Sequence, residues 1–293
     1  MDIESKKFLG QPKNFVSIFN ALLFYGQPVL KPEYLKDENS ELVMNVSSKH
    51  VDIIKRYEGG TYLDLFVIES QSYVDPSMAV RVMEYESVAR MRYIRQNFKQ
   101  HVPMHTRLPM ILTVVLYVGE SKWNAAKRLS ELEIIHPGFE DMFNEFKLNL
   151  IELNTNHKYN TGEKATQDFF DLLRMIYRKQ VLKEDLDREF NRDALYFAYV
   201  VTKNKELLSI YNKSEKGDVK VCRALDEMFE ESTNRGIQMG IKQGIEQGIE
   251  RGVKNTQIKI AIKMLVRNNQ TLEEISEIVG LDLDALRELK RSI

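Results

Sequence analysis

The sequence predicts an α/β core followed by an α-helical extension. Two segments rich in β-branched and aromatic residues, 51–57 and 62–71, flank a stretch with two adjacent glycines, and this pattern is typical of a β-hairpin. Apolar runs at 112–118 and 147–153 have the composition of two further core strands. Helical patterns lie between and behind these strands, and strands bracketed by helices are typical of an α/β fold.

Composition narrows the class of protein. Of the 293 residues, 43% are hydrophobic and 29% are charged, which is close to the average for globular proteins and argues against wholesale disorder. The formal net charge is -1, so any basic surface that attracts nucleic acid must be local. No segment reaches about 18 uninterrupted apolar residues, and residues 1–10 lack the apolar stretch of a signal peptide. We therefore expect a cytoplasmic protein with no membrane association, and the single cysteine agrees with a reducing compartment.

The elements in front of and behind the hairpin follow from local signals. The apolar segment 15–24 is expected to form a short buried helix that ends before Gly26. Residues 31–50 are expected to be a polar connection. Asp75 precedes Pro76, and a capping acceptor before a proline predicts the start of a long helix that ends near Phe98.

The rear of the chain is expected to be helical. Helices are predicted at 165–178 and 193–208. We expect four sections, which are a core, a helical extension, a glycine-rich helix or linker, and a small helical tail. Their boundaries are 1–160, 161–235, 236–255 and 256–293.

The glycine-rich section contains the one internal repeat. Glycines 236, 240, 244, 248 and 252 fall at every fourth position, and each is followed by Ile or Val; we call this segment the glycine ladder. Each glycine in a helix costs about 1 kcal/mol relative to alanine, so the ladder needs compensation, most simply from close backbone packing. We therefore expect a homo-oligomer that assembles through the ladder.

The tail has the outline of a helix-turn-helix. Thr271 and Glu274 have the spacing of a capping box, and Gly280 fits a helix C-cap. However, Asp282 and Asp284 would bring negative charge to the start of a DNA-reading helix. The sequence leaves both DNA reading and a packing or oligomerisation role open.

The second strand of the hairpin carries the candidate site. Its apolar run leads into Glu69-Ser70-Gln71, and side chains alternate along a strand, so Glu69 and Gln71 share one face. Asp64 lies on the other face and is an unlikely partner for Glu69.

Asp52, in the preceding strand, is the expected partner. If Tyr57 pairs with Tyr62, Asp52 lies opposite Val67 and diagonal to Glu69. Such diagonal neighbours are about 7–8 Å apart at the backbone, so their carboxylates can converge on one cation.

Two carboxylates suit a hard divalent ion. Asp52 and Glu69 can together hold Mg²⁺ or Mn²⁺, which keeps several waters and accepts a phosphate oxygen as a ligand. Gln71 has both a donor and an acceptor with which to orient an attacking water. We therefore expect Asp52, Glu69 and Gln71 to be catalytic, with the two acids as the metal ligands.

These residues resemble a known family. Asp52 in VDIIK and Glu69 and Gln71 in IESQS, followed by Met78, Arg81 and Tyr85, resemble the bacterial recombination-promoting nuclease and putative transposase family of the PD-(D/E)XK nuclease superfamily. The resemblance covers residues 8–125 well, the middle poorly, and the glycine ladder with its tail recognisably. Val51 departs from it, since many members have a basic residue there.

The resemblance implies a fold and an activity. The implied fold is a restriction-endonuclease-like mixed sheet flanked by helices, which would make residues 1–160 a nuclease-like core. The implied activity is metal-dependent hydrolysis of DNA phosphodiester bonds that promotes recombination or transposition-like events. A rival of another class is a catalytically weak or inactive nuclease fold that acts as a DNA-binding or scaffolding subunit, because Gln71 lacks the charge of a lysine.

The helix after the motif favours a DNA partner. Residues 76–108 contain six basic and two acidic residues, a net charge of +4 in a chain of net charge -1. Arg81 and Tyr85 are one helical turn apart and face the same way. We expect Arg81, Tyr85 and Arg92 to contact DNA.

Overall fold

The computed structural model describes residues 3–38, 53–59, 64–98, 101–214 and 217–293. It forms two compact units, Met1–Asp226 and Glu227–Ile293. None of the helices in the described part of the chain is both long enough and apolar enough to cross a membrane.

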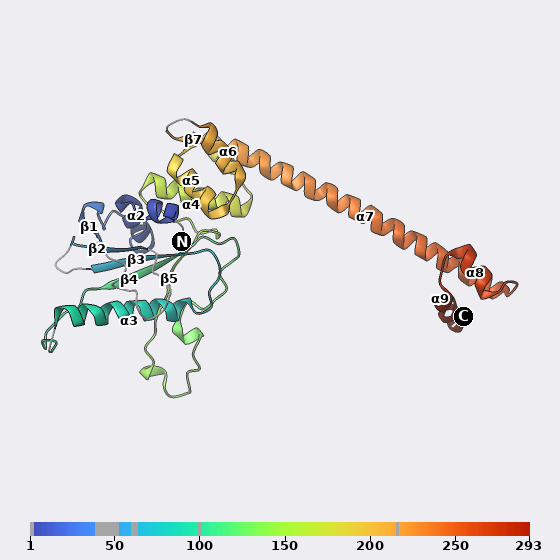
Figure 1. Ribbon diagram of the computed structural model, residues 1–293, viewed down its shortest axis with the longest axis horizontal. Coiled ribbons are helices and arrows are strands. Elements are labelled where there is room, and N and C mark those ends of the chain that lie inside the picture. The colour runs from blue at the N-terminus through green and yellow to red at the C-terminus, as the bar shows by residue number, and fades with distance from the viewer. Residues whose placement is uncertain (1–2, 39–52, 60–63, 99–100, 215–216) are drawn as a thin grey trace. The chain divides into compact units, whose positions relative to one another are not determined.

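The first unit is built on a five-stranded mixed sheet with the order β1-β2-β3-β4-β5 (Figure 1). Its strands are β1 Leu35–Asp37, β2 Ile53–Tyr57, β3 Asp64–Gln71, β4 Ile111–Tyr117 and β5 Asn149–Glu152. The strand β2 is antiparallel to both of its neighbours, β1 and β3, whereas β3, β4 and β5 are parallel. This arrangement confirms the predicted α/β class with a mixed sheet.

Helices cover both faces of this sheet. On one face lies α3 (Met78–Asn97) (Figure 1). Its residues Tyr85 and Ala89 pack with Leu65 and Val67 of β3. On the other lies α2 (Pro12–Leu23), whose Phe19 ring is 4.9 Å from the Phe66 ring. Because β3 is covered on both sides, its run of apolar residues needs no polar alternation.

The hairpin register differs from the predicted one. Tyr57 pairs with Asp64, and Ile53 pairs with Ile68, so the expected pairing of Tyr57 with Tyr62 is wrong. The difference is two residues, which leaves each side chain on its expected face. Packing on both faces sets this register, since the Tyr57 ring lies against Phe66, and the turn sequence alone could not reveal it.

Other boundaries also differ from expectation. The segment predicted to be a polar connection contains a 3₁₀ turn, Pro32–Tyr34, and the edge strand β1. The helix α3 begins at Met78 rather than at Pro76. A single helix predicted at 193–208 is two helices, because the backbone turns left-handed at Lys203 (φ 56°) and Asn204 caps the next helix by accepting from the Glu206 amide.

A helical layer completes the first unit. Its members are α1 Ile3–Leu9, α4 Lys164–Arg178, α5 Arg192–Thr202 and α6 Lys205–Lys213, with a two-stranded sheet of β6 Glu189–Phe190 and β7 Val219–Lys220. Phe8 of α1 packs on Phe169 and Phe197, at ring separations of 5.6 and 4.7 Å. The start of the chain is therefore held by residues far along it.

The second unit is helical. It contains most of α7 (Cys222–Arg267), together with α8 (Leu272–Val279) and α9 (Leu283–Ser292). The glycine ladder lies within α7 and is helical. The predicted capping box of Thr271 and Glu274 is present, and Gly280 ends α8 in the left-handed region at φ 70°. Five apolar residues form the small core: Ala261, Leu265, Ile275, Val279 and Leu286.

Candidate functional site

Glu69 lies at the carboxyl end of β3 on the face covered by α3. Its side chain is 5% exposed, and its Oε1 accepts a hydrogen bond from Arg81 Nη2 at 3.0 Å. Asp64, at the start of the same strand, instead accepts a hydrogen bond from the Met110 backbone amide at 3.2 Å. The strand thus separates the two acids, and Glu69 is the one turned toward the basic helix.

Arg81 organises this end of the sheet. Its side chain is 13% exposed and makes ion pairs with both Glu69 and Asp75. Arg81 Nε and Nη2 also donate to the Tyr85 hydroxyl, at 3.1 and 2.9 Å. The guanidinium, which is planar and has five N–H donors, can bridge three acceptors in this way.

Asp75 is a neighbour of the site that the sequence indicated only as a helix-capping residue. It lies in the turn between β3 and α3 and accepts hydrogen bonds from the Ser77 amide (2.9 Å) and hydroxyl (2.7 Å). Burial raises the pKa of Asp75, but the hydrogen bonds from Ser77 and Arg81 outweigh burial and hold the pKa below its ordinary value. Asp75 therefore stays charged and fixes Arg81 beside Glu69.

Tyr85 completes the cluster one turn further along α3. Burial raises its pKa; the hydrogen bond from Arg81 opposes this effect, and the negative charge of Glu69 adds to it. The neutral phenol is therefore the form favoured here. Its oxygen accepts from Arg81, so its proton remains available to donate.

Gln71 lies two residues beyond Glu69, and its side chain is almost completely buried. Among the described residues, its Nε2 has no hydrogen-bond partner. A buried amide donor without a partner costs about 1–3 kcal/mol, so its retention needs a reason. A water or an anionic oxygen bound beside Glu69 would supply the missing acceptor.

The neighbouring strand ends carry polar groups that sequence reasoning missed. Gln71 pairs with Tyr117 of β4, and Tyr117 pairs in turn with Glu152 of β5. Glu152 is ion-paired with Lys127. Burial and the negative charge of Glu152 raise the pKa of Tyr117. These residues could have been predicted from the sequence, because the carboxyl ends of parallel strands meet at one edge of the sheet.

Two other predicted site residues, Asp52 and Arg92, are not part of the Glu69–Arg81 cluster as described. Asp52 lies outside the described residues, so the predicted convergence of its carboxylate with Glu69 stays a prediction. Arg92 is half-buried on α3, three turns or about 16 Å beyond Arg81 and on the same side of the helix. Within the described residues, no group of three or more His, Cys, Asp or Glu side chains could hold a metal ion.

Comparison with known proteins gives one match. Residues 35–207, which are 173 of the 293 residues, match the family model described as "Putative transposase, YhgA-like". The chain belongs to the YhgA-like putative transposase family. The match runs from β1 into α6 and includes the whole Glu69–Arg81 cluster, whereas α7, α8 and α9 lie beyond it.

This membership confirms the resemblance stated from the sequence. The mixed sheet with flanking helices and the helical C-terminal region agree with the fold class predicted from the sequence. No curated protein and no solved structure matches the chain.

Proposed function

We propose that this YhgA-like protein is a divalent-metal-dependent endonuclease that hydrolyses DNA phosphodiester bonds. The observation that carries the proposal is the buried Gln71 amide, which has no partner among the described residues and follows a buried carboxylate at the carboxyl end of a strand. Family membership supports chemistry of the transposition or nuclease class on DNA.

The residues present fit a magnesium or manganese ion. Mg²⁺ keeps several waters and needs only one or two protein carboxylates, and Glu69 supplies one of them. In our proposal Asp52 supplies the second, which requires the β2–β3 ladder to continue by one pair so that residue 52 lies opposite Glu69. When bound, the ion would polarise the phosphoryl group and make its bound water more acidic.

The protein's own groups have distinct roles in this proposal. Gln71 donates from Nε2 to the attacking water or to a phosphate oxygen, and thereby holds it in line with the phosphorus. Arg81 provides the positive charge that a lysine at position 71 would provide and that Gln71 lacks. Four of its five N–H groups already donate to Glu69, Asp75 and Tyr85, so among the described residues one N–H on Nη1 is left to donate to a phosphate oxygen once DNA arrives.

DNA is proposed to lie along α3. Arg81 and Arg92 are on the same side of that helix, and Tyr85 between them is buried against β3, so in this proposal the two arginines contact the DNA and Tyr85 holds Arg81. Basic side chains about 16 Å apart can contact phosphates several nucleotides apart, which positions the duplex without reading its sequence.

One observation favours a second candidate function. Arg81 already neutralises Glu69, and an internal cation on a metal ligand weakens attraction for a metal ion. A subunit that binds DNA through α3 without cleaving it would have the same geometry. Cleavage assays separate the two functions.

The test is plasmid digestion in Mg²⁺, Mn²⁺, Ca²⁺ or EDTA. Glu69→Gln and Asp52→Ala are expected to abolish cleavage, and Gln71→Ala is expected to slow it by about 10²-fold. Asp64→Asn is the matched control, because Asp64 is an acid on the same strand whose partner is the Met110 amide. Equal loss in the Asp64 and Glu69 variants would argue against the site, and DNA binding without cleavage in any metal would favour the second function.

A further inference from the structure

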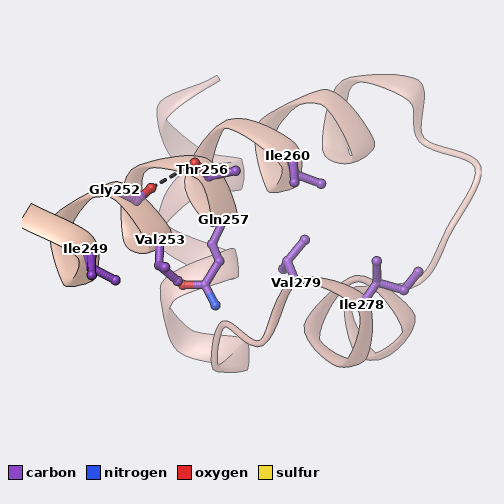
Figure 2. Close-up of a pocket in the computed structure, with 8 residues that line it drawn as sticks. All are labelled: Ile249, Gly252, Val253, Thr256, Gln257, Ile260, Ile278 and Val279. Carbon is purple, nitrogen blue, oxygen red and sulfur yellow. Dashed lines mark hydrogen bonds between the residues drawn. The ribbon is translucent and has the colours of Figure 1, made fainter.

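In the second unit, α8 and α9 pack on one side of α7. Ala261 and Leu265 of α7 belong to the small apolar core that the three helices share. Beside that core is an apolar groove of about 460 Å³, where Ile260 of α7 lies across from Ile278 and Val279 of α8 (Figure 2). These contacts fix which side of α7 is covered and which side faces solvent.

Three basic residues of α7 lie on the side that faces solvent; we call Lys259, Lys263 and Arg267 the basic stripe. Lys263 is two residues from both Ala261 and Leu265, and two residues rotate a helix by about 200°, so Lys263 points away from the core. Successive members are four residues apart, which places them about 6 Å apart along the axis and all within about 80° around it. All three are exposed, and none of them forms an ion pair within the part of the chain that the structure describes.

The charge of α7 in this unit is opposite to that of α8 and α9. Residues 251–267 contain five basic residues and no acidic one, whereas residues 268–293 contain six acidic and three basic residues. Asp282 caps the start of α9, and Asp284 beside it pairs with Arg287. In a helix-turn-helix, α9 would enter the DNA groove, and here it begins with two carboxylates. Phosphate groups are therefore attracted by α7 more than by α9.

The helix dipole does not account for the basic stripe. The dipole favours basic side chains near the C-terminus of a helix, but the effect fades beyond the last turn. It explains Arg267, which is in the last turn of α7, and leaves Lys259 and Lys263 unexplained. Like charges four residues apart repel one another in an isolated helix. Their position on one line favours an anionic partner that binds all three.

We propose that the basic stripe of α7 binds the phosphate backbone of DNA, so that the second unit contacts DNA through α7 and does not read bases through α9. The choice of DNA rests on the proposed function and on the family, but it requires DNA binding alone and not cleavage. Each strand of a duplex has one phosphate per about 3.4 Å of axis, so side chains 6 Å apart can contact neighbouring phosphates of one strand. Such contacts add affinity without sequence preference.

The test is DNA binding by the full chain, measured by fluorescence anisotropy in EDTA over a series of salt concentrations. One variant removes the stripe through Lys259→Gln, Lys263→Gln and Arg267→Gln. We expect it to bind at least about tenfold more weakly at low salt. The slope of log affinity against log salt concentration should become shallower by about 2.7, since each phosphate contact contributes about 0.9.

A variant of α9 is the matched control, with Arg287→Gln, Lys290→Gln and Arg291→Gln. It removes the same number of exposed positive charges from the same unit, and its salt slope is expected to stay that of the wild type. Because all six side chains are exposed, both variants are expected to fold, and circular dichroism checks this.

Three results would overturn the proposal. The first is an unchanged salt slope in the stripe variant, and the second is an equal or larger loss in the α9 variant. The third is binding to vesicles of anionic phospholipid that the stripe variant loses while it keeps its affinity for DNA. A wild type that binds no DNA would contradict the proposed function as well, whereas wild-type binding with an unchanged slope in the stripe variant overturns this inference alone.

Discussion

Glu69 shows how strongly one buried carboxylate constrains its neighbours. A charge that is 5% exposed is expensive to bury unless a cation and hydrogen bonds accompany it. Arg81 provides both, and Asp75 and Tyr85 hold Arg81 in place. The metal-free site is thus stabilised by a protein cation beside the proposed metal ligand.

This arrangement predicts competition between Arg81 and a divalent ion. Arg81→Ala leaves two acids without their cation, so the metal-free variant is expected to be about 3–5 kcal/mol less stable than the wild type. Mn²⁺ should then raise the melting temperature of Arg81→Ala more than that of the wild type, because the ion replaces the lost charge and binds only the folded state. Thermal unfolding with and without Mn²⁺ measures both effects.

Arg90→Ala is the matched control for that prediction. Arg90 also pairs with an acid on α3, Glu86, but the other hydrogen bonds of that pair are to Ile111 and Thr113 of β4. Equal Mn²⁺ shifts in the two variants would contradict a specific role for Arg81.

The residues of the site differ in how well sequence predicts them. Strand alternation was enough to separate Glu69 from Asp64, because the side-chain period of a strand does not depend on the register. The Arg81–Tyr85 pair followed from helical spacing. The contacts of Asp75 with Arg81, and of Lys127 with Glu152, depend on loop paths and on the order of strands, which no local pattern contains.

At the scale of elements, local signals located helices better than their interruptions. The capping box of α8 was predicted and is present, since its four residues determine it alone. The break between α5 and α6 was missed because it occurs at Lys203, whose left-handed backbone lacks the usual glycine signal. The strand β1 was missed because three residues of an edge strand carry too little pattern.

The start of α7 carries a pH-dependent contribution to stability. Cys222 is fully buried, and burial, with the negative charge of Asp185, raises its pKa from the ordinary 9.0 to about 12. The unfolded thiol ionises first as pH rises, so the contribution is complete below pH 9 and is lost as pH approaches about 12.

This contribution is measured by comparing the unfolding free energies of the wild type and Cys222→Ala. The free energy of unfolding in urea, wild type minus Cys222→Ala, is expected to shrink steadily from pH 8.5 to pH 11. Other alkaline titrations are common to both proteins and cancel. A difference that does not change with pH would contradict the raised pKa.

At the scale of the whole molecule, the first two helices of the first unit pack against elements that come late in its sequence. Phe8 packs against the rings of Phe169 and Phe197, which also contact each other at 4.4 Å. The Ser17 hydroxyl donates to the Thr166 hydroxyl at 2.9 Å across a separation of 149 residues. The helical layer is therefore not a separable addition to the sheet. Residues 3–23 pack against both the sheet and the helical layer.

Truncating Phe8 tests this packing. Phe8→Ala is expected to lower the free energy of unfolding of the first unit by about 3–5 kcal/mol, as for other buried aromatic residues. Trp123 is the one tryptophan of the chain and is buried in that unit, so its fluorescence in urea reports on this unit. Ile3→Ala is the control, because the Ile3 side chain is 82% exposed and its loss should change the free energy of unfolding by no more than about 0.5 kcal/mol. If Phe8→Ala and Ile3→Ala had similar effects, Phe8 would not be holding the helical layer to the sheet.

The same packing determines when the protein can fold as it is made. The ribosome releases Phe8 well before its partners, since Phe169 of α4 and Phe197 of α5 follow 161 and 189 residues later. At about 5–20 residues per second, that delay is roughly 8–40 s. For that time the Phe8 ring has no aromatic cluster to join. The nascent chain is thus a natural client for chaperones that shield apolar segments near the exit tunnel, and folding of the first unit must wait for synthesis to pass α5.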